Sequence, residues 1–227
     1  MIIAVGATKG GAGKSTTAIN LAVIDALAGK STLLIDTDLQ GTSRDWLEQR
    51  RQEGHEPGIE FLQVSGKQTF DVIQERAGVF DSVIVDCGGR QSAELQLSLA
   101  AADLVVVPVQ PSSADAWAFS DTLTAIRRAG EAIKQPIPTA VFVSRGSTNA
   151  KDREAADLMN HLRTLPGLVV LDARTSERKV YRDAISSGLG VIELKARTKR
   201  DAAPIEKAKA EVTGLHAALY ALMQKGA

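Results

Sequence analysis

Cysteine is nearly absent from this chain of 227 residues, which contains only Cys87. A single thiol excludes an intramolecular disulfide and any structural zinc site built on four cysteines or on two cysteines and two histidines. The three histidines, His55, His161 and His216, lie far apart in the sequence and indicate no set of metal ligands. Aromatic residues make up only 4% of the chain, so the hydrophobic core must be built from valine, leucine, isoleucine and alanine.

Long hydrophobic runs are absent as well. No apolar stretch approaches the roughly 20 residues needed to span a membrane, and Met1 leads into a strand-like pattern rather than a signal peptide. A content of 44% hydrophobic and 24% charged residues is typical of globular proteins and excludes global disorder. These features together predict a soluble, cytoplasmic protein.

The chain has no net charge, but its charges are unevenly distributed. Lysine and arginine together number 27, as do aspartate and glutamate. Residues 1–144 contain 12 basic and 17 acidic residues, whereas residues 145–227 contain 15 basic and 10 acidic ones. The basic C-terminal part indicates an anionic partner, although ordinary solvated helix faces have a similar composition.

Short β-branched runs alternate with longer helical patterns along the whole chain. Continuous apolar runs are typical of strands buried on both faces, as in a parallel sheet. The alternation, without a linker or repeat, predicts one doubly wound α/β domain over residues 1–227, with a mostly parallel sheet flanked by helices. The expected strands are residues 2–5, 32–35, 60–64, 82–85, 104–107, 139–143 and 168–171. The expected helices are residues 15–28, 42–53, 69–76, 92–101, 115–132, 149–165, 180–187 and 199–225, with Pro204 as a candidate break.

A glycine-rich loop directly follows the first expected strand. Residues 6–16 read Gly-Ala-Thr-Lys-Gly-Gly-Ala-Gly-Lys-Ser-Thr and lead into a helix, the context that the phosphate-binding pattern G-x-x-x-x-G-K-[ST] requires. Glycines let backbone N–H groups converge on phosphate oxygens, and the following helix adds its positive N-terminal end. This loop predicts that Lys14 bridges the β- and γ-phosphates of a nucleotide, Ser15 ligates Mg²⁺ and Thr16 reaches the α-phosphate.

Lys9 is a second lysine in this loop. Residues 9–15 form the deviant Walker A sequence, K-G-G-x-G-K-[ST], and here the chain resembles the ParA/MinD family of ATPases. The resemblance implies that Lys9 reaches across an ATP-bound sandwich dimer to the partner's phosphates. A second cation would stabilise the charge that develops on the transferring phosphoryl group. Carried over residue by residue, the resemblance places ATP against Lys9, Gly10, Gly11, Ala12, Gly13, Lys14, Ser15 and Thr16.

Two aspartates follow the second expected strand. Residues 36–41, Asp-Thr-Asp-Leu-Gln-Gly, are similar to the family's D-x-D-P-Q-G stretch, with Leu39 in place of the usual proline. The carboxyl end of a parallel strand faces the ligand crevice. The resemblance implies that Asp38 orients the attacking water, senses the γ-phosphate and lies at the metal site, while Asp36 supports the loop near Mg²⁺. The alternative for Asp38 is a capping role for the helix expected from residue 42.

Asp86 closes the strand expected over residues 82–85. Residues 80–89 resemble the family's Walker B stretch, which implies that Asp86 holds Mg²⁺ through a bound water. Gly88 and Gly89 stand where many members carry two prolines, and they would let the next loop move when the γ-phosphate leaves. Cys87 is interpreted as a small buried hydrophobic residue.

The resemblance extends over nearly the whole chain. Residues 102–112 are similar to the family's A-D-x-V-I-x-P-x-x-P-S, and residues 174–184 to its basic, tyrosine-bearing late segment. Ser144 and Arg145, at the end of an expected strand, match the position where family members contact adenine, although the usual asparagine is missing. The resemblance therefore adds these two residues to the expected ATP site.

The basic C-terminal part predicts a surface that binds DNA. Between Arg145 and Arg200, basic residues are interleaved with fewer acidic ones and with one aromatic, Tyr181. The lack of stacking aromatics disfavours single-strand recognition, and the lack of a helix-turn-helix pattern disfavours sequence reading. Duplex binding without sequence preference is expected, weakened by salt and strengthened when ATP brings two copies together. The expected contacts are Arg174, Arg178, Lys179, Arg182 and Arg197.

Two other functional classes share this kind of loop. An electron-transfer reductase of the nitrogenase iron-protein kind needs at least two cysteines per subunit to hold its cluster, and this chain has one. A MinD-like membrane-associated switch remains the alternative, because an apolar stripe runs along the last expected helix. The stripe consists of Val212, Leu215, Leu219, Leu222 and Met223. Such a stripe is more often packed on the core of a domain, and the final residues offer little lipid anchor.

The sequence thus predicts a ParA-type, Mg²⁺-dependent ATPase that is cytoplasmic and associated with the nucleoid. The resemblance implies an ATP-dependent homodimer, non-specific double-stranded DNA as a partner, no membrane partner, and a ParB-type or other cargo adaptor that stimulates hydrolysis. Plasmid or chromosome partition is the leading function, with other large cargoes as alternatives. The identity of the cargo depends on the adaptor rather than on the residues identified above.

Overall fold

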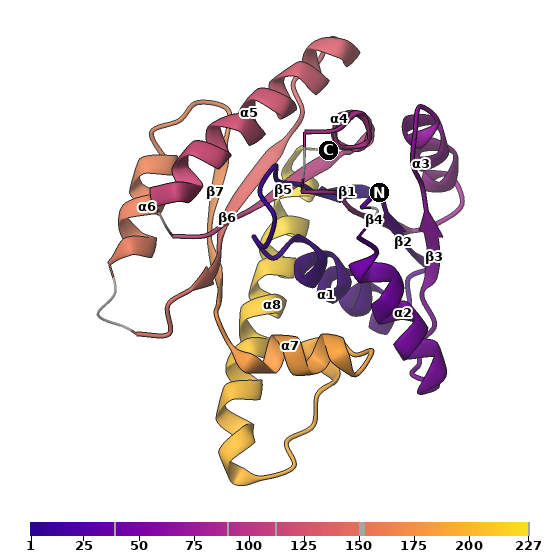
Figure 1. Ribbon diagram of the computed structural model, residues 1–227, viewed down its shortest axis with the longest axis vertical. Coiled ribbons are helices and arrows are strands. Elements are labelled where there is room, and N and C mark those ends of the chain that lie inside the picture. The colour runs from indigo at the N-terminus through magenta and orange to yellow at the C-terminus, as the bar shows by residue number, and fades with distance from the viewer. Residues whose placement is uncertain (39, 90, 112, 150–152, 227) are drawn as a thin grey trace.

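The centre of the molecule is a seven-stranded sheet in the order β3-β2-β4-β1-β5-β6-β7 (Figure 1). The structure is a computed structural model that describes residues 1–38, 40–89, 91–111, 113–149 and 153–226, so Leu39 and Ser112 lie outside the described residues. The strands are β1 (Ile2–Val5), β2 (Thr32–Asp36), β3 (Glu60–Gln63), β4 (Ser82–Asp86), β5 (Leu104–Val109), β6 (Thr139–Gly146) and β7 (Val169–Ser176). All six neighbouring pairs are parallel.

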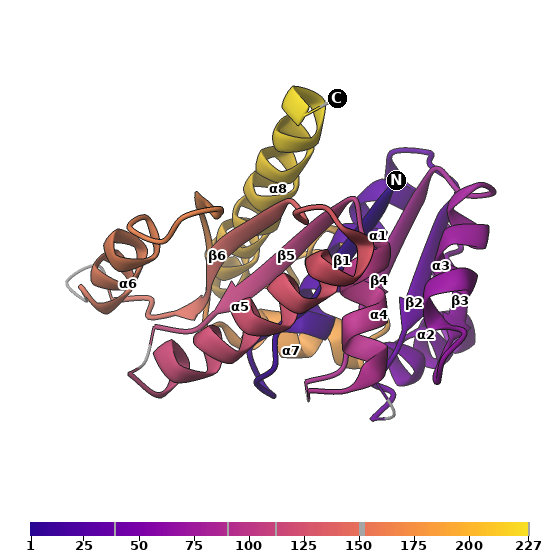
Figure 2. The same cartoon turned by 90° about the horizontal axis from the view of Figure 1, so that it is seen from above.

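Helices cover both faces of the sheet, as Figure 2 shows from above. They are α1 (Lys14–Leu27), α2 (Thr42–Gln52), α3 (Thr69–Ala77), α4 (Ala93–Ala101), α5 (Ser113–Ile133), α6 (Glu154–Leu162), α7 (Lys179–Ser186) and α8 (Lys199–Gly226), with a 3₁₀ helix, η1 (Val191–Glu193). Within the described residues, none of these helices is both long and apolar enough to cross a membrane.

Alternate residues of β1 face the two helical layers, as the twofold period of a strand requires. Ile3 and Val5 lie in a core with residues of α1, α2 and α8. Ile2 and Ala4 lie in a second core with residues of α3, α4 and α5. Both cores consist mainly of aliphatic side chains, as the low aromatic content predicted, and the predicted doubly wound α/β fold is confirmed.

Several elements differ from the sequence prediction, as α8, β7 and α6 illustrate. Helix α8 runs without a break through Pro204, which removes only the hydrogen bond to the carbonyl of residue 200, while Ile205 and Ala208 beyond it are buried. Strand β7 continues to Ser176 instead of ending near residue 171, because it follows β6 through two register shifts. Helix α6 is shorter than the predicted 149–165 and begins at Glu154.

The loops that follow three strands meet at one edge of the sheet because all strands are parallel. Strand β1 leads into residues 6–13, β2 into residues 37–41 and β4 into residues 87–92. Asp86 lies in register with Asp36 on one side and with Val5 on the other. The topology therefore brings the glycine-rich loop and both aspartate-bearing strand ends together.

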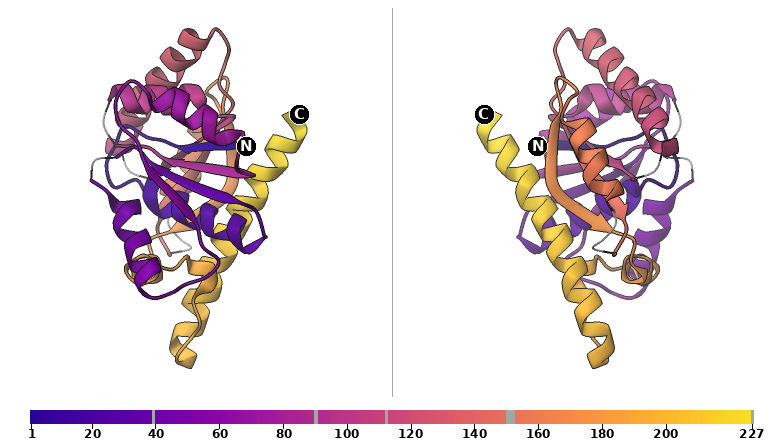
Figure 3. Two further views of the ribbon diagram at one scale, coloured as in Figure 1. Left: turned by 90° about the vertical axis from the view of Figure 1, so that its right-hand side faces the viewer. Right: turned by 90° about the vertical axis from the view of Figure 1, so that its left-hand side faces the viewer.

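The apolar stripe of α8 packs against the body of the molecule. Helix α8 runs as one long helix along one side (Figure 3), where Val212, Leu215 and Leu219 are buried and Leu222 and Met223 are partly buried. The stripe is therefore core, which removes the feature that favoured a membrane-associated switch.

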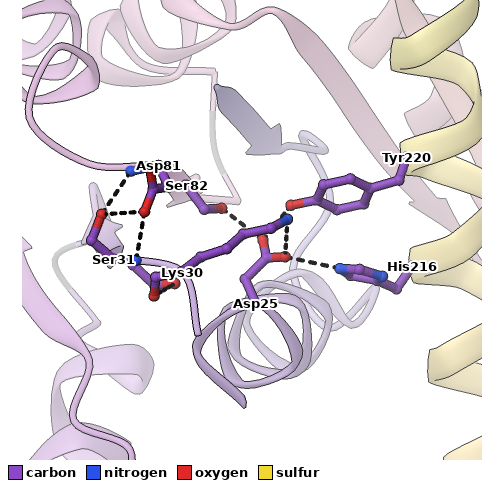
Figure 4. Close-up of polar contacts among 8 residues, drawn as sticks. Asp25, Lys30, Ser31, Asp81, Ser82, His216 and Tyr220 are labelled. Carbon is purple, nitrogen blue, oxygen red and sulfur yellow. Dashed lines mark hydrogen bonds and ion pairs between the residues drawn. The ribbon is translucent and has the colours of Figure 1, made fainter. Parts of the chain in front are cut away.

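A buried carboxylate anchors the C-terminal half of α8 (Figure 4). Asp25 of α1 is fully buried and accepts hydrogen bonds from Lys30 Nζ at 2.8 Å, Ser82 Oγ at 2.7 Å and His216 Nε2 at 3.0 Å, and from the Tyr220 hydroxyl. The Lys30 ammonium also lies 3.8 Å from the centroid of the Tyr220 ring. Burial raises the pKa of Asp25, but the bonds from His216, Lys30, Tyr220 and Ser82 together lower it well below its ordinary value of 3.8.

Replacing this carboxylate should destabilise the fold. We expect Asp25→Asn to lower the free energy of unfolding by about 2–4 kcal/mol at neutral pH, because the Lys30 charge loses its partner and an amide N–H faces hydrogen-bond donors. The folded pKa is lowered, so this stabilisation is complete above pH 3.8 and is lost as the pH falls below it.

Urea unfolding at several pH values measures the difference. The curves of wild type and Asp25→Asn should converge on acidification below pH 3.8. Asp81→Asn is the matched control, because Asp81 belongs to the same region but is exposed. Equal stability of wild type and Asp25→Asn at neutral pH would show that the cluster does not stabilise α8.

Candidate nucleotide-binding site

A cavity of about 460 Å³ opens at the edge of the sheet where the three loops meet. Nine of its lining residues were predicted from the sequence as site residues: Gly10, Gly11, Gly13, Lys14, Ser15, Thr16, Asp38, Ser144 and Arg145. Arg178 and Arg182, predicted as DNA contacts, also line it. Lys9 and Ala12 instead line a separate small cleft, together with Val107 and Phe119.

Two glycines of the site allow a close approach that no side chain permits. Gly13 precedes α1 with φ +94°, and a Cβ there would lie 2.6 Å from Ser144 Oγ. A Cβ on Gly89 would lie 2.9 Å from Lys14 Nζ and 3.2 Å from the Cα of Gly10. The loop after β4 therefore rests directly on the glycine-rich loop and on its lysine.

Lys14 is directed along the inside of the loop. It is the first residue of α1, is buried to 7% exposure, and donates a hydrogen bond from Nζ to the Lys9 carbonyl oxygen at 3.0 Å. An ammonium group has three N–H donors, and this bond uses one of them. The group is thus held at the cavity with further capacity to bind anionic oxygens.

Two buried carboxylates lie side by side at the ends of β2 and β4. Asp86 Oδ2 accepts a hydrogen bond from Ser43 Oγ at 2.7 Å, and Asp36 Oδ1 accepts one from the Asp38 N–H at 2.8 Å. The other two oxygens, Asp36 Oδ2 and Asp86 Oδ1, are buried without a hydrogen-bond partner among the described residues. Burial, followed by the charge of Asp36, raises the pKa of Asp86 to about 7, and burial raises the pKa of Asp36 to about 6.

The unpartnered oxygens fit a divalent cation. Mg²⁺ prefers oxygen ligands and is usually held by one or two carboxylates together with water and substrate phosphates. The Ser15 hydroxyl lies near enough to Asp86 to lower the pKa of that carboxyl, so the two predicted metal ligands are close together. In the part of the chain that the structure describes, there is no group of three or more His, Cys, Asp or Glu side chains that could hold a metal. The carboxylate pair and the Ser15 hydroxyl fit Mg²⁺ held together with water and nucleotide phosphates.

Asp38 lies half-buried at the cavity and does not cap α2. Its Oδ1 accepts a hydrogen bond from the Gln40 N–H at 3.0 Å, and its carbonyl oxygen accepts one from the Gly41 N–H at 3.2 Å. The N-cap of α2 is Gly41, which has no side chain to cap the helix. The capping alternative for Asp38 is therefore wrong, and its turn keeps the carboxylate beside the glycine-rich loop.

Arg145 links the glycine-rich loop to the segment before α7. It has a left-handed φ of 54°, and its Nη1 donates a hydrogen bond to the Gly11 carbonyl oxygen at 2.6 Å. Its Nε forms an ion pair with Glu177, which also binds Arg182 Nη1 at 2.9 Å. The neighbouring Ser144 is buried against Gly13. Arg145 is therefore the larger polar side chain on this wall of the cavity.

Sequence reasoning missed several polar residues of the site. Gln110 donates to the Gly11 carbonyl oxygen at 3.1 Å, Ser43 binds Asp86, and Glu177 connects two arginines. None of them belongs to a motif that specifies a role. Gln110 and Glu177 each directly follow a strand that ends at the site edge, and this position could have indicated that they belong to the site. Ser43 lies inside a helix, and its sequence position gave no such indication.

The predicted DNA contacts differ in how free their charges are. Arg178 is 17% exposed and binds Glu211 Oε1 through Nη2 at 2.9 Å and Nε at 3.1 Å. Glu211 also accepts hydrogen bonds from Ser176 and Tyr181, so Arg178 belongs to a structural network and does not fit a free phosphate contact. The other four predicted contacts are exposed: Arg174, Lys179, Arg182 and Arg197. Two of them form exposed ion pairs, Lys179 with Asp183 and Arg182 with Glu177.

Comparison with known proteins agrees with the fold and the loop. Residues 3–200 match the family described as the CobQ/CobB/MinD/ParA nucleotide binding domain. The chain is 28% identical over 209 residues to protein ParA of Rhizobium radiobacter, which covers 92% of this chain and 93% of that protein. It is 27% identical over 213 residues to maintenance of carboxysome distribution protein A of Halothiobacillus neapolitanus, covering 92% and 95%.

The fold is shared with a solved structure. The cell division ATPase MinD of Pyrococcus furiosus aligns with a TM-score of 0.71 over 97% of this chain and 98% of that chain, at 17% sequence identity. Because the family match covers most of the chain and includes the glycine-rich loop, the resemblance to ParA and MinD is confirmed. The protein belongs to the CobQ/CobB/MinD/ParA family of nucleotide-binding domains.

Proposed function

We propose that this protein is a Mg²⁺-dependent ATPase of the ParA type that positions a plasmid, a chromosome or another large cargo. The observation that carries the proposal is the convergence of Lys14, Ser15, Asp38 and Asp86 at one edge of the sheet, beside a second loop lysine, Lys9. The names of the relatives, a ParA and a carboxysome distribution protein, support a positioning role. We place the protein in the cytoplasm, on the nucleoid.

In this proposal the loop holds the phosphates of ATP. The N–H groups of residues 10–16 and the start of α1 bind phosphate oxygens, Lys14 binds the β- and γ-phosphates, and Thr16 binds the α-phosphate. Ser15 and Asp86 hold Mg²⁺, which when bound supplies neutralising charge between the β- and γ-phosphates. Ser144 and Arg145, which both line the cavity, form the wall beside the nucleoside.

Asp38 and Lys9 have separate roles in hydrolysis. Asp38 orients the attacking water, since its carboxylate is held at the cavity by the turn through Gln40 and Gly41. Lys9 does not line the nucleotide cavity of its own chain and lies instead at the small cleft beside Val107 and Phe119. We assign it to the phosphates of the partner in an ATP-bound homodimer, where it stabilises the charge of the transition state.

The proposed DNA surface comprises Arg174, Lys179, Arg182 and Arg197. All four are exposed and belong to the basic C-terminal part of the chain. Two copies joined by ATP present twice as many cations to the phosphates of one duplex, so affinity depends on the nucleotide state. A ParB-type or other adaptor stimulates hydrolysis, and the separated monomers release DNA.

Duplex DNA binding in ATP and in ADP tests the proposal. We expect binding to be at least about tenfold tighter with ATP, and log K to fall with log salt by about 0.9 for each phosphate that the protein neutralises. Arg174→Gln, which removes one cation from each subunit, should make this salt slope shallower by about 0.9 for each phosphate no longer neutralised. Arg128→Gln, an exposed arginine of α5 on the other face of the sheet, is the control and should change neither quantity.

Equal affinity in both nucleotide states would contradict the switch, and binding that does not weaken with salt would contradict a phosphate-tracking surface. The same titration with Arg178→Gln separates the assignment above from the sequence prediction. Arg178→Gln should disrupt the network around Glu211 and therefore lower the thermal stability of the protein. A change in the salt slope without this loss of stability is not expected.

A further inference from the structure

Helix α2 contacts the carboxylate pair of the site at its first turn. Ser43 lies in this turn, is fully buried, and donates its hydroxyl hydrogen to Asp86 Oδ2 at 2.7 Å. Asp36 ends β2, and the loop from there to α2 carries Asp38, whose N–H binds Asp36. The N-terminal end of α2 is thus joined to both buried carboxylates.

The other end of α2 is clamped to the connection between α7 and η1. Arg50 is 1% exposed, its two Nη atoms each lie 2.9 Å from a carboxylate oxygen of Glu193, and Nη1 also donates to the Gly188 carbonyl oxygen at 3.0 Å. Trp46 Nε1 donates to the Leu189 carbonyl oxygen at 3.3 Å. A Cβ on Gly188 would lie 2.5 Å from the Arg50 nitrogen, so the backbones themselves are in contact.

Helix α7 in turn reaches the nucleotide cavity. Tyr181 and Arg182 line the cavity, and Arg182 is linked through Glu177 and Arg145 to the Gly11 carbonyl oxygen of the glycine-rich loop. The two ends of α7 therefore contact the site by different routes. The N-terminal end is joined to the glycine-rich loop, and the C-terminal end is joined through α2 to Asp86.

We propose that α2 transmits the occupancy of Asp86 to α7, with Ser43 and Arg50 as positioning residues. The inference rests on the proposed function only in requiring Mg²⁺ and nucleotide beside Asp86. A cation bound at the unpartnered Oδ1 of Asp86 draws charge from the carboxylate and weakens the hydrogen bond from Ser43 to Oδ2, which displaces the first turn of α2. A helix of 11 residues moves as a rigid rod about 16 Å long, so the displacement reaches Arg50.

The clamp at Arg50 converts this displacement into a movement of α7. The two parallel hydrogen bonds between the Arg50 guanidinium and the Glu193 carboxylate fix their relative geometry. The backbones at Arg50 and Gly188 are in contact, so neither can move without the other. Helix α7 carries the exposed Lys179 and Arg182 of the proposed DNA surface. Nucleotide state and outer surface would then be coupled within one subunit, in addition to any effect of dimerisation.

Trp46 provides a direct measurement of this coupling. The chain has two tryptophans, so a Trp117→Phe background leaves Trp46 as the sole tryptophan reporter. Trp46 is buried in α2 between Ser43 and Arg50 and is not part of the nucleotide cavity lining. We expect addition of Mg²⁺ to the ADP-bound protein to shift its emission. In Ser43→Ala this shift should be lost, while ADP still binds in the absence of Mg²⁺.

Hydrogen exchange measured by mass spectrometry reports on α7 itself. We expect Mg²⁺, added to the ADP complex, to slow exchange over residues 179–193 in the wild type. The effect should be lost in Ser43→Ala and in Arg50→Lys, which keeps the charge but not the planar fork. Arg51→Ala, at the next and exposed position of α2, is the matched control and should retain the effect.

Ser43 lies seven residues from Arg50, about 10 Å along the helix axis. At this distance, two substitutions that act independently have additive effects on stability. Loss of the α7 response in Ser43→Ala, in a variant whose circular dichroism and whose Mg²⁺ affinity in the ADP complex match the wild type, therefore indicates transmission through α2. Persistence of the response in Ser43→Ala would overturn the inference and leave the proposed ATPase intact. If Arg50→Lys does not fold, Ser43→Ala alone decides. Failure of the wild type to bind ADP would instead contradict the proposed function.

Discussion

Replacing Lys14 by alanine should abolish measurable ATP hydrolysis and weaken MgATP binding on the order of 100-fold. A hydrogen bond to a charged group contributes about 1.5–3 kcal/mol, and the Lys14 ammonium has two donors left after its bond to the Lys9 carbonyl oxygen. Removal of these phosphate interactions is not offset by water, because Lys14 is buried and Gly89 rests on its amino group. Isothermal titration with ATP in the presence of Mg²⁺ measures the affinity.

The matched control for this substitution is Lys67→Ala. Lys67 is an exposed lysine outside the glycine-rich loop and does not line the nucleotide cavity. This variant should bind and hydrolyse ATP as the wild type does. Near-normal affinity in Lys14→Ala would show that the cavity does not bind phosphates in the proposed orientation, because within residues 6–16, all of which the structure describes, no other cation lines it.

The fold was predictable because its strands are encoded locally. Continuous runs of valine, leucine and isoleucine mark β4 and β5, and their burial on both faces follows from the parallel sheet that joins them to β1. The glycine-rich loop was predictable for the same reason, since Gly13 and Lys14 occupy fixed positions between a strand and a helix. Only the ends of elements differed, as at β7, where pairing with β6 overrides local propensity.

The parts of the site that could not be predicted depend on contacts between distant segments. Arg178 was expected on the surface because its sequence neighbours are basic, but its partner Glu211 lies 33 residues away on α8. Ser43 binds Asp86 across 43 residues, and nothing in its local sequence distinguishes it from an ordinary helix residue. Such pairs are fixed by the packing of α2 and α8 on the sheet, which composition and spacing do not reveal.

Lys9→Ala should reduce the rate of ATP hydrolysis on the order of 1,000-fold while leaving ATP affinity within about threefold of the wild type. In the proposed dimer, a cation supplied by the partner subunit stabilises the charge of the transition state, whereas the phosphates of bound ATP are held by the subunit's own Lys14. Asp38→Ala should also bind ATP but fail to orient the attacking water. Each substitution therefore removes a different component of one composite site.

Mixing the two inactive variants tests whether Lys9 acts on the partner. In a mixed dimer, the site that contains an intact Asp38 belongs to the Lys9→Ala chain and receives the intact Lys9 of the Asp38→Ala chain. Random pairing makes half of all dimers mixed, each with one complete site, so an equimolar mixture should recover about one quarter of wild-type turnover. If Lys9 acted within its own chain, every site in the mixture would lack one residue, and no activity would return. Recovery measured across mixing ratios should peak at equal amounts, and its absence despite dimer formation in sedimentation would contradict the assignment of Lys9.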